Sequence, residues 1–200
     1  FKKNNICDKI LRERRNIMGY KTMDANEAVS RVSYKFTEIA GIYPITPASP
    51  MAEKVDVLAS KGEINFWGNK VKVIEMESEK GAIATVHGAL QAGVLATTYT
   101  ASQGLLLMIP SIYKMAGEML PGVIHVAARS LSTHSLSIFG DHQDIYAVRQ
   151  TGACMLSSSS VEEAYHMAMV SHLASIKSSL PFINFFDGFQ INTIKIIEKK

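Results

Sequence analysis

Short apolar runs alternate with amphipathic helical patterns along most of this 200-residue chain. The apolar runs have the length of strands, about four to eight residues, and helical periodicity fills the intervals between them. Strands that alternate with helices are typical of α/β proteins, in which helices cover a parallel sheet. We therefore predict a parallel sheet of about six strands flanked by helices. Its strands are expected at residues 42–45, 71–76, 94–101, 123–128, 154–157 and 182–186.

The helices are predicted from the spacing of apolar residues and from capping residues. Asp24, with Glu27 three residues later, has the pattern of a capping box, and apolar residues then recur at helical spacing as far as residue 40. Further helices are expected at residues 50–60, 79–91, 105–120 and 161–178, with a break in the third of these at Pro110. Residues 102–104 are predicted to form a turn, a short helix is predicted to end at Gln150, and residues 191–200 are predicted to form a tail.

Three polar residues follow predicted strands and are the candidate site residues. Thr46 lies between Pro44 and Pro47, which stiffen the turn around it. Glu79 opens the helix after strand 71–76, and Arg129 directly follows strand 123–128. In an open parallel sheet, ligands bind beyond the carboxyl ends of the strands, so these three side chains are expected to converge there. A hydroxyl, a carboxylate and a guanidinium suit a small anionic substrate.

Each candidate also has an ordinary structural explanation. Thr46 could simply cap a helix, and Glu79 could gain from the helix dipole, with Glu75 and Glu77 making it less distinctive. Arg129 could form an ion pair with an acid of the polar loop at residues 131–144, where Asp141 and Asp144 lie.

Two short segments suggest other chemistries. Ser102, within Thr100-Ala101-Ser102-Gln103-Gly104, lacks the first glycine of a nucleophile elbow, so a serine hydrolase is not favoured. Asp141, His142 and Asp144 could bind a metal, but a polar loop with satisfied hydrogen bonds is the favoured interpretation, and we predict no metal ligands in this chain.

Composition and charge narrow the class of protein. A net charge of +3 is too small to indicate a nucleic-acid partner, and much of it comes from residues 1–17. That segment is expected to be a basic extension outside the fold, either a transit peptide or sequence that precedes a natural start at Met18. Two distant cysteines give neither a cluster spacing nor a disulfide framework. The uncharged stretch 81–113 contains too many polar residues and glycines for a membrane span.

Several segments, in register, resemble the signatures of the pyruvate:ferredoxin (flavodoxin) oxidoreductases. They are Tyr43-Pro44-Ile45-Thr46-Pro47-Ala48-Ser49-Pro50, residues 75–82, residues 98–110, residues 136–144 and residues 185–189. The resemblance extends over about residues 20–198. It implies a thiamine-diphosphate-binding fold, with residues 18–200 as a single pyrimidine-binding domain cut from the N-terminal part of a larger multidomain enzyme.

The resemblance also implies an activity and roles for the candidate residues. The family converts pyruvate and coenzyme A to acetyl-CoA and carbon dioxide and passes electrons through iron–sulfur clusters to ferredoxin or flavodoxin. Glu79 matches the glutamate that bonds the aminopyrimidine ring of thiamine diphosphate, while Thr46 and Arg129 match residues that hold pyruvate. Departures from the family pattern are Lys80, beside Glu79, and Gln190.

Other parts of the expected enzyme have no counterpart in the sequence. Magnesium, the iron–sulfur clusters and the diphosphate site are expected in domains absent from this chain. The implied partners are those remaining domains, ferredoxin or flavodoxin and coenzyme A, in a cytoplasmic homodimer without a membrane or nucleic-acid partner. The alternatives are the same chemistry on another 2-oxo acid, or a non-catalytic docking module. By itself this chain is expected to be inactive.

Overall fold

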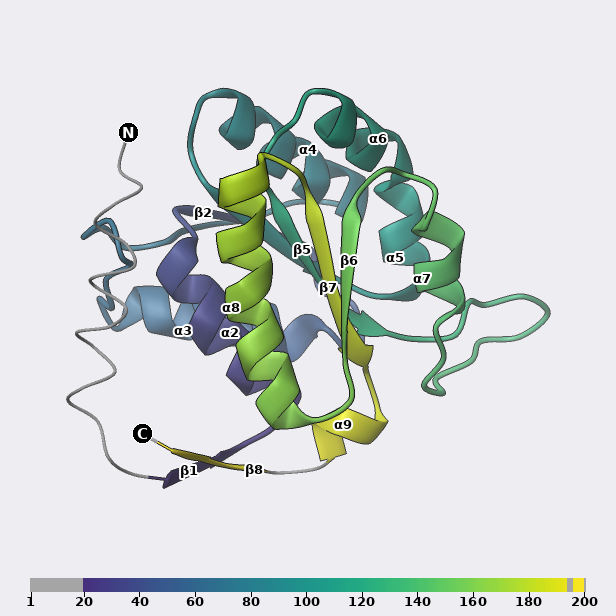
Figure 1. Cartoon of the computed structure of the whole chain (residues 1–200). Coiled ribbons are helices and arrows are strands. Elements are labelled where there is room, and N and C mark those ends of the chain that lie inside the picture. The colour runs from purple at the N-terminus through teal and green to yellow at the C-terminus, as the bar shows by residue number, and fades with distance from the viewer. Residues whose placement is uncertain (1–19, 194–195, 200) are drawn as a thin grey trace.

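Helices and strands alternate through the computed structural model, which describes residues 20–193 and 196–199 (Figure 1). The strands are β1 (Tyr20–Met23), β2 (Ile39–Ile42), β3 (Lys72–Glu75), β4 (Ala96–Thr100), β5 (Val123–Ala128), β6 (Cys154–Ser158), β7 (Phe182–Asp187) and β8 (Ile196–Lys199). The helices are α2 (Ala25–Phe36), α3 (Ser49–Ser60), α4 (Glu79–Gln91), α5 (Ser102–Leu107), α6 (Ile109–Gly117), α7 (Gln143–Val148), α8 (Val161–Ser178) and α9 (Gln190–Thr193).

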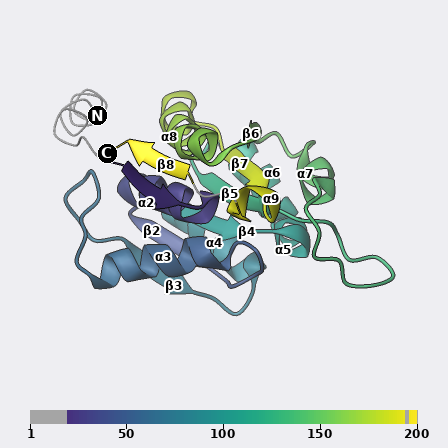
Figure 2. The same ribbon diagram turned by 90° about the horizontal axis from the view of Figure 1, so that it is seen from below.

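Six strands form one parallel sheet between two layers of helices. Their order is β3-β2-β4-β5-β7-β6, and every pair of neighbours is parallel. Helices α2, α3 and α8 cover one face, and α4 to α7 cover the other, as the two views show (Figures 1 and 2). The predicted α/β class, with a parallel sheet of about six strands, is therefore confirmed.

Alternation along the central strands explains why the sheet needs helices on both faces. In β5, Ala127 faces the core under α2, α3 and α8, while Ile124 and Val126 face the core under α4 to α7. All six residues of β5 are buried, as expected for a parallel strand covered on both faces. Gly41 in β2 lets α4 approach closely, because a Cβ there would lie 2.6 Å from the Ala82 carbonyl oxygen.

The prediction for the strand before Thr46 was wrong by three residues. Helix α2 ends at Phe36, because Thr37 takes an extended conformation, and the strand is Ile39–Ile42 rather than residues 42–45. Residues 39 and 40 matched the helical spacing by coincidence, since both belong to the strand. Thr46 therefore lies in the loop between β2 and α3 instead of at the strand's end, and the peptide bond from Thr46 to Pro47 is cis.

Two further predictions needed correction. Residues 102–104 form the first turn of α5 instead of a separate turn, and the expected helix 105–120 is two helices, α5 and α6, that meet at Met108. Pro110 lies at the start of α6, where a missing backbone N–H costs nothing. The expected tail contains α9 and strand β8, which pairs antiparallel with β1. The short helix before Gln150 ends at Val148.

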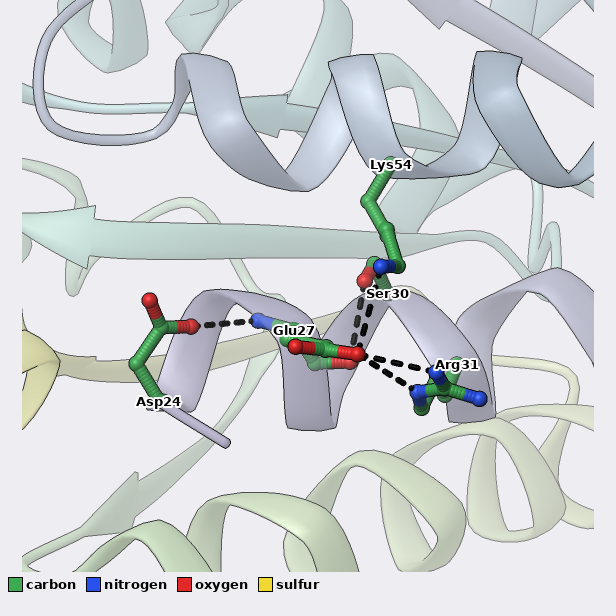
Figure 3. Close-up of polar contacts among 5 residues, drawn as sticks. All are labelled: Asp24, Glu27, Ser30, Arg31 and Lys54. Carbon is green, nitrogen blue, oxygen red and sulfur yellow. Dashed lines mark hydrogen bonds and ion pairs between the residues drawn. The ribbon is translucent and has the colours of Figure 1, made fainter. Parts of the chain in front are cut away.

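The amino end of α2 is fixed by polar contacts (Figure 3). The Asp24 carboxylate caps the helix by accepting the Glu27 backbone N–H at 2.8 Å. The Glu27 carboxylate in turn accepts two hydrogen bonds from Arg31, at 2.9 and 3.0 Å. It also forms an ion pair with Lys54 of α3 at 3.2 Å. These contacts hold α2 against α3, the helix that follows Thr46.

The predictions for the basic segment 1–17 and for the uncharged stretch 81–113 have different outcomes. The basic extension at residues 1–17 lies outside the described residues. Within the described part of the chain, no helix is long and apolar enough to cross a membrane.

Candidate functional site

Arg129 and Thr46 come together at the carboxyl edge of the sheet. The Arg129 guanidinium donates from Nη1 to the Thr46 carbonyl oxygen at 3.0 Å and from Nε to the Ser137 carbonyl oxygen at 2.9 Å. Arg129 is only 7% exposed, whereas the Thr46 side chain is exposed. No carboxylate pairs with this guanidinium among the described residues. A buried positive charge bound only by carbonyls leaves Nη2 available to an anion.

Asp144 organises the ends of β4 and β5 without touching the guanidinium. Its carboxylate accepts backbone N–H groups from Ser102 at 2.8 Å, Arg129 at 3.1 Å and Ile145 at 2.8 Å. Burial raises the pKa of the Asp144 carboxyl, and the three backbone donors oppose that rise. The alternative ion pair between Arg129 and Asp144 does not occur among the described residues, and the Asp144 carboxylate binds the Arg129 main chain instead.

Glu79 is a buried carboxylate at the first position of α4. Ser78 caps the helix by accepting the Gly81 N–H at 3.2 Å, so Glu79 lies where the helix dipole favours a negative charge. Glu79 is only 7% exposed, whereas its neighbours Glu75, Glu77 and Lys80 are exposed. No hydrogen bond or ion pair to Glu79 occurs within residues 20–193. Burial thus distinguishes Glu79 from its two neighbouring glutamates.

A slot beside Glu79 is left open by Gly104 in the first turn of α5. A Cβ at Gly104 would lie 2.8 Å from Glu79 Oε1 and 2.6 Å from Thr100 Oγ1. The Thr100 hydroxyl is itself buried and has no hydrogen-bond partner in the described chain. A side chain at residue 104 would therefore overlap both groups. A buried carboxylate and a buried hydroxyl, both without a partner in the described chain, are features that fit a small polar group bound against α4.

The three predicted residues are only partly brought together. Thr46 and Arg129 share a hydrogen bond, while Glu79 contacts Gly104 and is linked to Arg129 through α5, Ser102 and Asp144. An open cavity of about 410 Å³ lies beside Thr46, between the amino ends of α2 and α3 and residues Gly188 and Phe189. Neither Glu79 nor Arg129 lines this cavity, so it borders the candidate site instead of forming it.

Ser102 shares the backbone of a nucleophile elbow but not its chemistry. It lies between β4 and α5 with a positive φ of 49°, the strained conformation of such an elbow. However, the side chain is fully buried, and its hydroxyl donates to the Ser130 carbonyl oxygen at 2.8 Å rather than to a histidine. The strained turn holds α5 in place and does not present a nucleophile.

Comparison with known proteins identifies the family. Residues 31–200 match a family described as pyruvate flavodoxin/ferredoxin oxidoreductase, thiamine diphosphate-binding. The chain belongs to this family. It is 59% identical over 182 residues to pyruvate-flavodoxin oxidoreductase of Klebsiella pneumoniae, and 57% identical over 185 residues to pyruvate:ferredoxin oxidoreductase of Moorella thermoacetica. These alignments cover 89% and 90% of this chain, but only 16% of each relative.

A solved structure supports the fold. The 2-oxoglutarate:ferredoxin oxidoreductase from Magnetococcus marinus, a protein with 2-oxoglutarate, coenzyme A and succinyl-CoA bound, superposes with a TM-score of 0.73 at 23% sequence identity. The match covers 86% of this chain and 30% of that chain. The family member described here thus has a thiamine-diphosphate-binding α/β fold and spans about a sixth of the length of its curated relatives.

The sequence pointed to the strand ends but not to the residues that support them. Gly104, Thr100 and Asp144 were each visible in motifs, yet their packing against Glu79 and Arg129 depends on contacts between distant segments. Gly188 is a fourth such residue, since a Cβ there would lie 2.3 Å from Pro47 Cγ. Only Gly188 directly follows a strand, whereas Thr100 ends β4, Gly104 lies in α5 and Asp144 lies in α7, so no single sequence signal marks these residues.

Proposed function

We propose that this domain holds the aminopyrimidine half of thiamine diphosphate in an enzyme that oxidises pyruvate. With coenzyme A, the reaction gives acetyl-CoA and carbon dioxide, and the electrons pass to ferredoxin or flavodoxin. The observation that carries the proposal is the buried Glu79 carboxylate, which lacks a protein partner in the described chain and faces the slot left by Gly104. The pyruvate-oxidising relatives named above support the choice of substrate.

Glu79 has the properties of a residue that exchanges a proton with a ring nitrogen. Thiamine diphosphate, when bound, supplies a weakly acidic thiazolium carbon and an electron sink for decarboxylation. Glu79 would hold a proton at the ring nitrogen of the aminopyrimidine, and its burial strengthens that hydrogen bond by excluding water. Exposed Glu75 and Glu77 would share this contact with solvent, so they are weaker candidates.

Arg129 and Thr46 would bind and orient the pyruvate. The guanidinium is oriented by the carbonyls of Thr46 and Ser137, and its free Nη2 would donate to the substrate carboxylate. The exposed Thr46 hydroxyl would donate a second hydrogen bond to the same substrate. The Asp144 carboxylate also accepts the Arg129 backbone N–H, so contacts with three segments fix the main chain and the guanidinium of Arg129.

The remaining machinery is proposed to lie in other domains of the complete enzyme. Magnesium, the diphosphate contacts, the iron–sulfur clusters and the coenzyme A site belong to that part of the proposal, as do a homodimeric assembly and a cytoplasmic location. The loop between β5 and α7 projects from the body of the domain (Figure 1) and exposes Leu136, Ile138 and Phe139. These apolar side chains lie on the loop that bonds Arg129, a place suited to contact with another domain.

Two alternatives remain distinguishable from the main proposal. Another 2-oxo acid could serve as substrate, because other domains would complete the pocket around the substrate's side chain. The kcat/KM values of the complete enzyme for pyruvate and for 2-oxobutyrate would distinguish these two cases. A non-catalytic docking module would not need a buried carboxylate without a partner, and its function would tolerate loss of that carboxylate.

The decisive experiment replaces Glu79 in the complete enzyme that carries this domain. Glu79→Gln is expected to fold and bind thiamine diphosphate, because the amide is nearly isosteric, but to slow exchange of the thiazolium C2 proton into heavy water by about 10²–10⁴-fold. NMR follows the exchange, and calorimetry follows cofactor binding. The matched control is Glu77→Gln, an exposed glutamate two residues away that should leave the exchange rate unchanged. Wild-type exchange in Glu79→Gln would remove Glu79 from the mechanism.

A further inference from the structure

Gly104 and Thr100 enclose the place where the Glu79 carboxylate lies. The position that a Cβ of residue 104 would take is within 2.8 Å of Glu79 Cγ and Oε1 and within 2.6 Å of Thr100 Oγ1. Real Cβ contacts are never this short, so the side chain of residue 104 and the carboxylate compete for one space. Gly104 has no positive φ, so the requirement for glycine here comes from this steric contact and not from the backbone conformation.

We propose that Gly104 and Thr100 are positioning residues for the Glu79 carboxylate. Gly104 keeps the slot open, and the Thr100 hydroxyl faces the slot as a donor for the carboxylate when the aminopyrimidine is bound. The inference rests on the role proposed above for Glu79, and it adds two residues that act by positioning the Glu79 carboxylate.

Thr100 and Glu79, on the two sides of the slot, differ in rigidity. This difference determines which of them would move if a methyl group filled the slot. Thr100 is β-branched, fully buried and paired within the central strand β4, so its hydroxyl cannot retreat. The turn before Gly104 is also fixed, because Ser102 is bonded through its N–H to Asp144 and through its hydroxyl to Ser130. Glu79 has a flexible side chain, so a methyl group at residue 104 would displace the carboxylate.

The Thr100 hydroxyl has a reason to face this slot. It is buried without a hydrogen-bond partner in the described chain, a state that costs free energy unless another group completes it. Of the other threonines of β4, Thr97 accepts a hydrogen bond from Thr37 at 2.8 Å, while Thr98 Oγ1 is also buried without a partner in the described chain. Thr100 is distinguished by its place, because a Cβ at Gly104 would lie within 2.6 Å of Thr100 Oγ1 and 2.8 Å of Glu79 Oε1.

The first test compares Gly104→Ala with Gly88→Ala in the complete enzyme. A Cβ at Gly88, on the same helix as Glu79, would meet nothing within 4 Å, so this variant controls for a glycine-to-alanine change in general. Gly104→Ala is expected to slow exchange of the C2 proton by about 10²-fold, the cost of misplacing a catalytic group by about 1 Å. Calorimetric titration should show thiamine diphosphate bound within about tenfold of wild-type affinity, and Gly88→Ala should match wild type in both measurements.

A double-mutant cycle separates this inference from the role of Glu79. If Gly104 acts through Glu79, Gly104→Ala combined with Glu79→Gln should exchange no more slowly than Glu79→Gln alone. Slow exchange in Glu79→Gln with wild-type exchange in Gly104→Ala, or multiplicative effects in the double mutant, would overturn the inference and leave the role of Glu79 intact. Wild-type exchange in Glu79→Gln would overturn both.

Thr100 supplies a second test that holds even if Gly104→Ala does not fold. Thr100→Val removes the hydroxyl at nearly constant shape and should slow exchange about tenfold, the order expected for one hydrogen bond to a charged group. Thr100→Ser restores the hydroxyl and should recover the wild-type rate, while calorimetry should show similar cofactor affinity for both variants. Equal exchange rates in the valine and serine variants would contradict the role of the hydroxyl.

Discussion

At the scale of single residues, burial separates side chains that the sequence makes equivalent. Glu75, Glu77 and Glu79 are the same residue type at alternate positions, yet only Glu79 is buried. Keeping a carboxylate away from water costs free energy unless it is hydrogen-bonded, so a bound group that pairs with Glu79 would offset this cost. Lys80 does not supply that compensation, because it is exposed and forms no ion pair with Glu79 in the described structure.

Arg129 should be sensitive even to a change that keeps its charge. Arg129→Lys in the complete enzyme leaves one ammonium in place of a planar group that bonds Thr46 and Ser137 simultaneously. We expect kcat/KM for pyruvate to fall by at least about tenfold, since hydrogen bonds of charged groups contribute about 1.5–3 kcal/mol. The affinity for thiamine diphosphate should change much less. Steady-state pyruvate kinetics and calorimetric titration of the cofactor measure the two effects.

The control for Arg129 is another arginine with two side-chain hydrogen bonds. Arg31 on α2 donates from Nε and Nη2 to Glu27, on the surface and away from the candidate site. Arg31→Lys should leave pyruvate kinetics unchanged. If Arg129→Lys behaved in the same way, the guanidinium would be a structural connection between two loops and nothing more.

At the scale of elements, sequence patterns predicted those that pack by regular periodicity. Strand β5 and helices α4 and α8 have the predicted bounds because each begins and ends at a clear signal, such as the Ser78 and Ser160 caps. The bounds of β2 were wrong because Ile39 and Ala40 fit helical and strand spacing equally well. Strand β8 was missed because its pairing with β1 joins segments that lie far apart in the sequence.

The candidate site was predictable to the same extent. A parallel sheet brings residues after its strands to one edge, so Glu79 and Arg129 could be chosen as candidates from strand positions. Thr46 was chosen on the same ground although β2 ends four residues before it. The contacts that orient these three side chains could not be predicted from the sequence, because the contacts depend on differences of tenths of an ångström in the distances between elements. The approach of Gly104 to Glu79 and of Gly188 to Pro47 are two such contacts.

Two buried histidines connect β5 and α8 in the core. His125 Nε2 and His172 Nε2 are 3.1 Å apart, and Asn184 lies 3.0 Å from the other nitrogen of His125. Burial lowers the pKa of His172 to about 3, and burial together with the nearby His172 holds the pKa of His125 well below its usual value. Both rings are therefore neutral in the folded chain at neutral pH.

This pair should make the domain sensitive to acid. Unfolded histidine has a pKa of about 6.5, so below that pH the unfolded chain binds protons that the folded chain does not. Stability is thus fully present above pH 6.5 and is lost as the pH falls toward 3, by up to about 1.4 kcal/mol per pH unit for each histidine. His172→Gln should flatten the pH dependence of the free energy of unfolding between pH 6.5 and 5, measured by urea denaturation, even if it lowers stability at pH 7.

The control for His172 lies on the same helix. His166 is on the exposed side of α8, and His166→Gln should keep the wild-type pH dependence. Hydrogen bonds to His87 and Ser159 lower the carboxyl pKa values of Glu118 and Glu163 respectively. These two groups therefore take up protons at lower pH than an unfolded histidine does, and their contribution to the pH dependence is the same in every variant. An unchanged slope in His172→Gln would show that His172 is protonated at little cost in the folded state.

At the scale of the whole molecule, the candidate site lies at the carboxyl edge of the sheet, where Thr46 is exposed and Glu79 and Arg129 are each 7% exposed. Glu79, Arg129 and Thr46 lie along one edge of the sheet, and the loop that orients Arg129 exposes Leu136, Ile138 and Phe139 beside them. The chain spans about a sixth of its curated relatives. An edge with polar groups and neighbouring exposed apolar side chains is what a half-site requires when a second domain completes it.

The proposed half-site predicts a large difference in cofactor affinity between this chain and the complete enzyme. The contact proposed for the cofactor in this chain is the Glu79 carboxylate beside Gly104, and a carboxylate repels the negatively charged diphosphate instead of binding it. We expect the isolated 200 residues to bind thiamine diphosphate at least about 10²-fold more weakly, equivalent to about 2.8 kcal/mol of binding free energy. Calorimetric titration of both proteins under the same conditions, with magnesium present, measures the difference.

A variant of the isolated chain makes this titration specific. Weak binding through the slot should weaken further in Gly104→Ala, in which a methyl group would occupy the space beside Glu79, and should be unchanged in Gly88→Ala, in which a methyl group meets nothing within 4 Å. Binding by the isolated chain as tight as in the complete enzyme, and sensitive to Gly104→Ala, would mean that these 200 residues hold the whole cofactor. The diphosphate and its magnesium would then have to lie within reach of Glu79 in this domain, and the half-site would be refuted.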